Sequence, residues 1–138
     1  MNDLDRTLKE MDLKFFASGQ HGITLAMAAD CLENSEQCVF LDVRTEEEAH
    51  YAMFGNVQHI PLEQLPDRVG EISHKQTVIV FCTSVVRASM AAFYLRAEGL
   101  TSVRTLMANS EEMVKLFSPA EVFRRRNLFG QQNINCCI

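Results

Sequence analysis

The sequence predicts an α/β fold in which a mostly parallel central sheet is covered by helices on both faces. Runs rich in β-branched residues alternate along the chain with stretches whose apolar residues recur at helical spacing, and this alternation is typical of parallel sheets. The run Thr77–Phe81 is apolar or β-branched at every position, as expected of a strand buried on both faces. With 138 residues and 47% hydrophobic composition, the chain can bury the core of one domain without disulfide staples.

The first twenty residues predict a helix outside this main fold. Leu4, Leu8, Met11 and Phe15 recur at helical spacing, so the segment is expected to form an amphipathic helix. An apolar stripe of this kind must be covered by something. We expect it to pack on the domain rather than on a partner protein.

The remaining elements alternate between helices and strands. Thr24 is a suitable N-cap for a helix over Leu25–Leu32. Pro66 must kink or restart the helix expected at 62–72, and Gly99 ends the helix that precedes it. The other expected elements are strands at 39–43, 57–60, 77–81 and 103–107, and helices at 46–51, 88–98, 111–117 and 119–126.

The segment after the central strand predicts an anion site built around a thiolate. Cys82 follows the last residue of that strand, and Arg87 opens the next helix. Ligands of open α/β sheets bind at the carboxyl ends of the strands, and N–H groups at a helix N-terminus attract anions. The same field favours the thiolate form of Cys82, and Arg87 adds donors suited to oxyanions. The alternatives are that Cys82 is a buried small hydrophobe and that Arg87 is a solvated first-turn arginine.

Three segments follow one another in a fixed order along the chain. They are residues 40–48 with the triplet Asp-Val-Arg and an acidic run, Gly55 with Ile-Pro-Leu at 60–62, and the loop at 82–88, which is similar to CxxGxRS. Together they resemble the rhodanese family of single-domain sulfurtransferases, and the resemblance covers roughly residues 23–117. The sequence departs from the family pattern at Val85, where a glycine is common, at Asn56, where alanine is usual, and at 108–109, where a Gly-Gly pair often stands.

The resemblance implies a three-layer fold with a five-stranded sheet and a two-step covalent reaction. Cys82 would attack the outer sulfur of a donor such as thiosulfate and hold this sulfur as a persulfide. A thiol, an acceptor protein or cyanide would then accept the outer sulfur from Cys82. Asp42 and Arg44 are expected to be structural, as polar groups at a strand end that fix neighbouring loops. The resemblance also implies that backbone N–H groups of the active-site loop stabilise the bound sulfur. Beside Cys82 and Arg87, the implied site residues are Thr83, Ser84, Val85 and Val86.

Two other functions fit the same residues. One is a catalytically weak or inactive rhodanese-like module with a regulatory or binding role, because Val85 would be strained if the loop required φ > 0. In that case Val85→Gly should raise activity. The other is a small cysteine-dependent phosphatase or arsenate reductase. The arginine is the fifth residue after the cysteine, and this short loop favours a persulfide sulfur over a tetrahedral phosphate.

We expect the chain to have three parts. They are a helical extension at 1–20, the domain at 21–130, and a polar tail at 131–138 that we expect to be flexible. Five cysteines and no CxxC spacing indicate free thiols, and the four histidines form no ligand pattern, so neither a metal site nor a cofactor is expected. A thiol of Cys136 or Cys137 on the tail could accept sulfur from Cys82 or form a disulfide with it; the alternative is an inert terminus.

The net charge and the hydropathy of the chain argue against two classes of partner, nucleic acids and membranes. A net charge of −5 argues against nucleic acid, and the arginine run 124–126 is too short to reverse that. No stretch approaches the length of a membrane span, and the polar, acidic start does not resemble a signal peptide, so we expect a cytoplasmic protein without membrane contact. The expected partners are a small sulfur donor and a thiol or protein acceptor, while the oligomeric state stays open.

Overall fold

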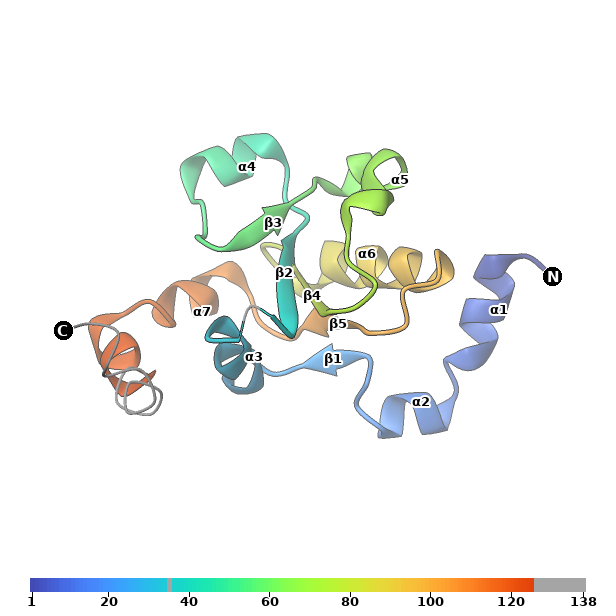
Figure 1. The fold of residues 1–138 in the computed structure, drawn as a ribbon, viewed down its shortest axis with the longest axis horizontal. Coiled ribbons are helices and arrows are strands. Elements are labelled where there is room, and N and C mark those ends of the chain that lie inside the picture. Colours follow the sequence, from blue (N-terminus) through green and yellow to red (C-terminus); the bar gives the residue numbers. More distant parts are fainter. Residues whose placement is uncertain (35, 126–138) are drawn as a thin grey trace.

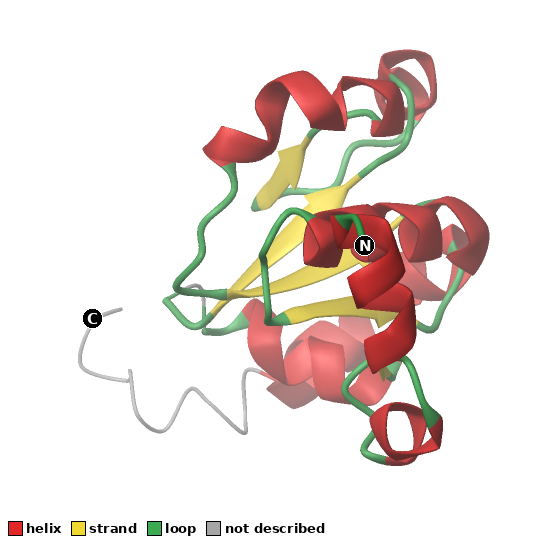
Figure 2. Ribbon diagram, turned by 90° about the vertical axis from the view of Figure 1, so that its right-hand side faces the viewer, coloured by secondary structure: helices red, strands yellow, loops and turns green. Residues whose placement is uncertain are grey.

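A five-stranded, fully parallel sheet forms the centre of the protein, and helices lie on both of its faces (Figure 1, Figure 2). The computed structural model describes residues 1–34 and 36–125. The strand order is β1-β5-β4-β2-β3, which places β4 in the middle. The strands are β1 (Gly22–Ile23), β2 (Cys38–Asp42), β3 (Val57–His59), β4 (Thr77–Phe81) and β5 (Val103–Leu106).

The helices complete the three layers that the sequence predicts. They are α1 (Asp3–Glu10), α2 (Leu13–Ala17), α3 (Leu25–Leu32), α4 (Glu46–Tyr51), α5 (Leu65–Arg68), α6 (Val85–Ala97) and α7 (Ser110–Lys115), with 3-10 turns at Leu62–Gln64 and Val69–Glu71. Residues 119–125 are also helical. The predicted fold class is therefore confirmed, including helical structure before the sheet. No helix of the described residues is long and apolar enough to cross a membrane.

Two hydrophobic clusters lie on opposite faces of the sheet. On one face, Val78 and Val80 of β4 pack with residues of α5 and α6. On the other face, Ile79 and Phe81 pack with residues of α3 and α7. All four side chains are fully buried, so β4 has the two-sided burial expected of a central parallel strand. Cys82 continues the alternation and faces the α6 side.

Several boundaries agree with the sequence because local chemistry defines them. The helices α3 and α4 and the strand β4 have the predicted bounds. The side chain of Thr24 accepts a hydrogen bond from the Met27 N–H and starts α3, as predicted. Gly99 has φ +100 and ends α6, a conformation that favours glycine.

The N-terminal extension differs from the prediction. Instead of one helix from Leu4 to Phe15 there are two, because the Asp12 side chain accepts a hydrogen bond from the Phe15 N–H and caps a new helix. The apolar stripe is also split. Phe15 is buried, whereas Leu4 and Leu8 are exposed. The first helix does lie against the domain, in contact with α6 and with Thr7 buried, but Leu4 and Leu8 do not take part in that packing.

Two further elements were predicted incompletely. The helix expected at 62–72 consists of a 3-10 turn, the short α5 and a second 3-10 turn, with Pro66 at the start of α5. The strand β1 has two residues and carries too short a pattern to be recognised in the sequence. The last predicted helix is helical as far as residue 125, and the tail at 131–138, with Cys136 and Cys137, lies outside the described residues.

Candidate active site

Cys82 lies at the carboxyl edge of the sheet, between the end of β4 and the start of α6. Only Thr83 and Ser84 separate it from the helix, which begins at Val85, three residues earlier than predicted. The side chain of Cys82 is fully buried, and its thiol donates a hydrogen bond to the backbone oxygen of Ser84. The Cys82 sulfur is therefore covered, with the Ser84 backbone oxygen as its neighbour.

The start of α6 supplies donors beside this cysteine. The first N–H groups of a helix have no partner within the helix, and the Ser84 side chain does not cap them. Because α6 is 13 residues long, its dipole adds partial positive charge at the same end. The N-terminus of α6 can thus stabilise a negative sulfur, as the sequence predicts for the backbone of this segment.

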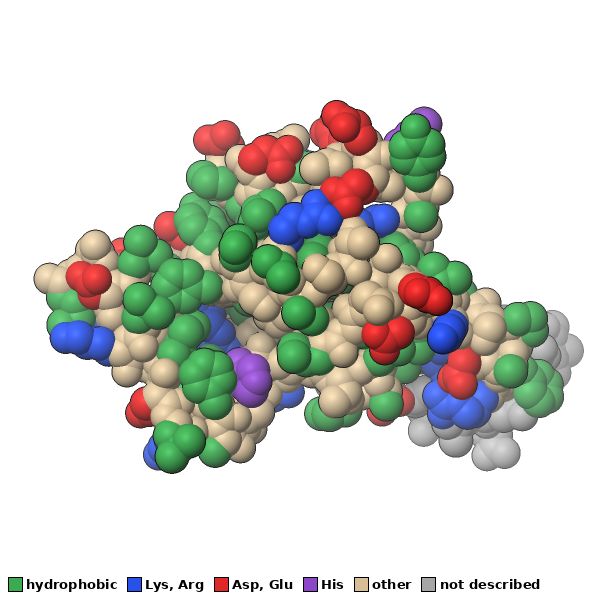
Figure 3. Space-filling model, turned by 180° about the vertical axis from the view of Figure 1, so that it is seen from behind, with side chains coloured by type: hydrophobic (Ala, Val, Ile, Leu, Met, Phe, Trp, Pro, Cys, Tyr) green, Lys and Arg blue, Asp and Glu red, His purple; other side chains and the backbone are tan. Residues whose placement is uncertain are grey.

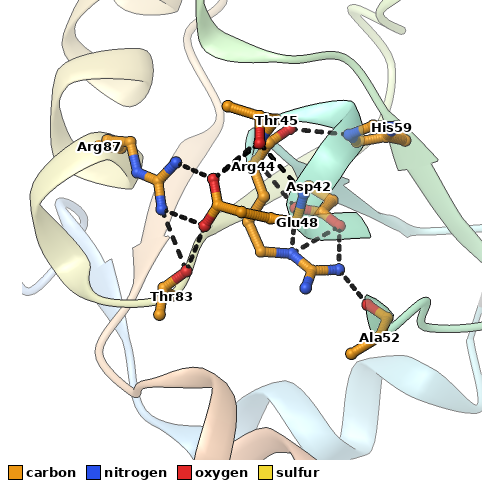
Figure 4. A network of polar contacts seen from close by, with 8 residues as sticks. All are labelled: Asp42, Arg44, Thr45, Glu48, Ala52, His59, Thr83 and Arg87. Atoms are coloured by element: carbon orange, nitrogen blue, oxygen red, sulfur yellow. Dashed lines mark hydrogen bonds and ion pairs between the residues drawn. The ribbon is translucent and has the colours of Figure 1, made fainter. Parts of the chain in front are cut away.

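Arg87 is held by a carboxylate from another element. Its two terminal nitrogens donate to the carboxylate oxygens of Glu48 at 2.5 and 2.7 Å, and one of them also donates to the Thr83 hydroxyl at 3.0 Å (Figure 4). The Thr83 hydroxyl in turn donates to Glu48 at 2.9 Å. The bidentate pair raises the pKa of Arg87 and, against partial burial, lowers that of Glu48 well below its usual range.

This contact changes the interpretation of Arg87. The sequence predicted that Arg87 would place donors and positive charge beside Cys82. In the structure its guanidinium is bound to Glu48 and Thr83, and Cys82 also contributes to the raised pKa of Arg87. The cationic side chain thus fixes the position of Thr83 relative to α4. Its assignment as a catalytic residue stays a prediction.

Glu48 is a site residue that our sequence reading missed. It lies in the first turn of α4, where its carboxylate accepts from the Thr45 N–H at 3.2 Å while its own N–H donates to the Thr45 hydroxyl. This capping box is visible in the sequence as threonine followed three residues later by glutamate. The contact with Arg87 joins residues 39 positions apart, and no local pattern indicates it.

Removing the Glu48 carboxylate should flatten the acid limb of the stability curve. Because the folded-state pKa of Glu48 lies below the ordinary value of 4.5, its contribution is complete above that value and is lost as the pH falls below it. Urea denaturation between about pH 6 and pH 3 should therefore show a smaller loss of stability for Glu48→Gln than for the wild type. Glu36→Gln, which removes an exposed carboxylate at the opposite edge of the sheet, should keep the wild-type slope. If stability fell equally with pH in the wild type, Glu48→Gln and Glu36→Gln, the Glu48–Arg87 pair would not stabilise the fold.

Asp42 and Arg44 form a buried ion pair behind the active-site loop (Figure 4). The Arg44 Nε and Nη2 donate to the two carboxylate oxygens of Asp42 at 3.0 and 2.7 Å, and Nη2 also reaches the Ala52 carbonyl at 2.6 Å. The guanidinium lies 5.1 Å from the centre of the Phe54 ring, and the His59 Nε2 is 2.8 Å from the Arg44 backbone oxygen. These contacts join the end of β2 to the segments after α4 and in β3, which supports the structural role expected of the pair.

Val85 is not strained. It is the first residue of α6, and among the described residues other than glycine only Asn56 has a positive φ. The strain explanation for a weak active site is therefore wrong, because the helix starts early enough to give Val85 ordinary helical geometry. The departure from glycine at this position does not by itself argue against turnover.

The prediction for Val85→Gly is reversed accordingly. Glycine in a helix costs about 0.5 to 1 kcal/mol relative to alanine, so the variant should loosen the first turn of α6 and lower the rate of sulfur transfer. Single-turnover kinetics and thermal unfolding of Val85→Gly and Val85→Ala would measure both effects. A glycine variant faster than the wild type would restore the strain explanation.

The other described cysteines lie away from this edge. Cys31 and Cys38 pack in the cluster on the α3 face, and Cys38 begins β2, at the end of the sheet opposite Cys82. Burial, together with a side-chain hydrogen bond to Cys38, raises the pKa of Cys31 to about 12, so it remains a thiol at neutral pH. The described part of the chain contains no cluster of three potential metal ligands.

The sequence around Cys82 also matches a known protein family. The family model described as "Rhodanese-like domain" matches residues 27–112, which include β2, α4, Cys82 and α6. The chain belongs to the rhodanese-like domain family. The family resemblance of the three sequence segments is thereby confirmed.

Curated relatives and solved structures agree with the family. A tRNA uridine(34) hydroxylase of Xylella fastidiosa is 29% identical over 82 residues, which cover 55% of this chain and 32% of the relative. A sulfurtransferase of Allochromatium vinosum is 29% identical over 75 residues, or 54% of this chain and 70% of the relative. The chain thus spans about a third of the length of the first relative.

Two single-domain sulfurtransferases share the rhodanese-like fold. The Saccharomyces cerevisiae protein has a TM-score of 0.61 at 18% identity, over 69% of this chain and 89% of its own. The human protein has a TM-score of 0.58 at 20% identity, over 68% of this chain and 95% of its own. At these identities the likeness concerns the fold alone.

Proposed function

We propose that this protein is a sulfurtransferase that carries sulfane sulfur as a persulfide of Cys82. The observation that carries the proposal is the position of Cys82, at the carboxyl edge of the sheet and separated by two residues from a 13-residue helix. The rhodanese-like family and the relative named sulfurtransferase support the same chemistry. Residues 1–20 precede the matched region, and we infer that they are an addition to the catalytic domain.

The reaction has two displacements at sulfur. In the first, the Cys82 thiolate attacks the outer sulfur of the donor, the sulfur–sulfur bond of the donor breaks, and the leaving group departs with the electron pair; from thiosulfate this group is sulfite. In the second, an acceptor thiolate attacks the outer sulfur of the Cys82 persulfide and regenerates the Cys82 thiolate. The N-terminus of α6 stabilises the negative persulfide between the two steps.

The first step requires a change in the loop. While Cys82 is a thiol, its hydrogen bond to the Ser84 backbone oxygen is favourable. Once the proton leaves, the sulfur and the carbonyl oxygen both carry negative charge and repel each other. We infer that the Ser84 carbonyl turns away from the thiolate, which also uncovers the sulfur for the donor.

Mass spectrometry of the intact protein after incubation with a sulfane donor tests the proposal. The donors are thiosulfate and an alkyl persulfide, each followed by a thiol acceptor. We expect a mass gain of one sulfur atom located on Cys82 and its loss after the thiol is added. If Cys82 gains no sulfur from either donor, the inactive binding module is the better assignment. Release of phosphate from an aryl phosphate by a Cys82-dependent reaction would instead support the phosphatase alternative.

A further inference from the structure

The mouth of the Cys82 site is acidic. Glu46 and Glu47 are exposed in the first turn of α4, next to Glu48, whose carboxylate touches Thr83. Glu111 and Glu112 are exposed in the first turn of α7, and this helix is tied to the same loop because the Ser110 N–H donates to the Thr83 carbonyl at 3.1 Å. Carboxylates therefore flank the active-site loop on two sides.

Carboxylates outnumber cations around the loop. Residues 45–51, 82–88 and 107–112, all of them described, contain five glutamates and one arginine, Arg87. Two further cations lie near these segments: Arg68 of α5 interacts electrostatically with Glu46, and Lys115 stands in the last turn of α7. Glu48 already neutralises Arg87 through both guanidinium nitrogens. The approach to Cys82 is thus negative, although the helix end beneath it attracts anions.

Such a field selects among sulfur donors. Thiosulfate is a small dianion, and the carboxylates at the mouth oppose its entry within roughly the 8 Å over which charges act at physiological salt. A donor that brings its own positive charges is attracted by the same groups. The persulfide formed on Cys82 still gains the donors of the α6 N-terminus, because only Thr83 and Ser84 separate Cys82 from the start of that helix.

Exposed apolar side chains lie beside the same mouth. Val86 and Met90 are exposed one turn apart on α6, at 57% and 58%. Met107 is 51% exposed and follows β5 as Cys82 follows β4; the register Val80↔Thr105 places the two residues at the same level on neighbouring strands. Figure 3 shows apolar side chains interspersed with carboxylates and basic side chains over one face of the molecule. A surface of this composition fits a macromolecule better than a hydrated inorganic ion.

We propose that this rim is the docking surface for a protein segment that carries a cysteine persulfide flanked by basic and apolar residues. The inference rests on the proposed function of Cys82. In the transfer, the Cys82 thiolate bonds to the outer sulfur of the partner's persulfide as the sulfur–sulfur bond of the partner breaks. The partner's cysteine leaves with the electron pair as a thiolate. Basic residues pair with the exposed glutamates at the rim, and apolar residues cover Val86, Met90 and Met107.

The test compares matched persulfide donors with the full-length protein. Two short peptides share a central cysteine persulfide with leucine on either side, and one has lysines where the other has glutamates. Thiosulfate and cysteamine persulfide, a small cationic donor without an apolar surface, complete the set. Stopped reactions analysed by mass spectrometry give the second-order rate at which Cys82 gains sulfur from each donor.

We expect the lysine peptide to react about tenfold faster than the glutamate peptide at low salt, with the ratio falling as salt screens the charges. The double variant Glu47→Gln/Glu111→Gln should reduce this ratio and speed the reaction with thiosulfate. Glu36→Gln, which removes an exposed carboxylate at the opposite edge of the sheet, should leave both unchanged.

Each contrary result has its own meaning. Equal rates with the two peptides would overturn the docking surface and leave the proposed function intact. A reaction with cysteamine persulfide as fast as with the lysine peptide would also overturn it, because the apolar residues would then contribute nothing. If none of the donors places sulfur on Cys82, the proposed function fails, and the docking surface fails with it.

Discussion

Replacing Cys82 with serine should lower the rate of sulfur transfer by about a thousandfold or more while leaving the fold unchanged. A serine oxygen cannot carry sulfane sulfur as a persulfide, so the covalent route is lost. The fold should persist because serine is similar in size and its hydroxyl can donate to the Ser84 backbone oxygen as the thiol does. Transfer from the preferred donor to a thiol gives the rate, and thermal unfolding reports on the fold.

The matched control for this variant is Cys31→Ser. Cys31 is also packed beside the sheet, but it lies on the α3 face, away from the active-site loop. Its replacement should therefore leave the rate of transfer unchanged. Wild-type transfer by Cys82→Ser, or equal losses in both variants, would exclude Cys82 as the nucleophile.

Breaking the buried ion pair should have the largest effect on stability. Arg44→Met should lower the free energy of unfolding by about 3 to 5 kcal/mol, because it leaves the Asp42 carboxylate buried without its partner. Both side chains are almost completely inaccessible to solvent, so water cannot replace the lost hydrogen bonds. Urea denaturation at neutral pH measures the loss.

Arg68→Met is the corresponding control on the surface. Arg68 pairs with Glu71 at 2.8 Å, but both side chains are substantially exposed. Its loss should cost less than about 1 kcal/mol. If Arg44→Met were no more destabilising than Arg68→Met, the Asp42–Arg44 pair would not be the structural tie between β2 and its neighbouring loops.

The sequence predicted the fold best where the residues of a single segment determine its secondary structure. Five apolar or β-branched residues are enough to define β4, and a threonine N-cap is enough to start α3 and α4. The prediction failed where two local signals competed. In the N-terminal extension the apolar stripe continued through Asp12, but the capping hydrogen bond of Asp12 was the stronger signal and divided the helix.

The candidate site shows the same limit at longer range. The position of Cys82 could be predicted because it depends on the strand before it and the helix after it. The engagement of Arg87 could not, because Glu48 reaches it from a separate helix. Likewise, the backbone conformation of Val85 depends on where α6 begins. The apolar run after Arg87 predicted a start at residue 88, whereas the helix begins three residues earlier, at Val85.

The cover over Cys82 has a consequence for damage by oxidants. Peroxide converts exposed thiolates first to sulfenic acid and then to sulfinic and sulfonic acids, and the last of these is irreversible. In the structure the Cys82 side chain is fully buried and its thiol is occupied by the Ser84 carbonyl. In this conformation the Cys82 sulfur is therefore shielded from peroxide. Under the proposed mechanism, irreversible oxidation of Cys82 is limited to the time during which the Ser84 carbonyl is turned away.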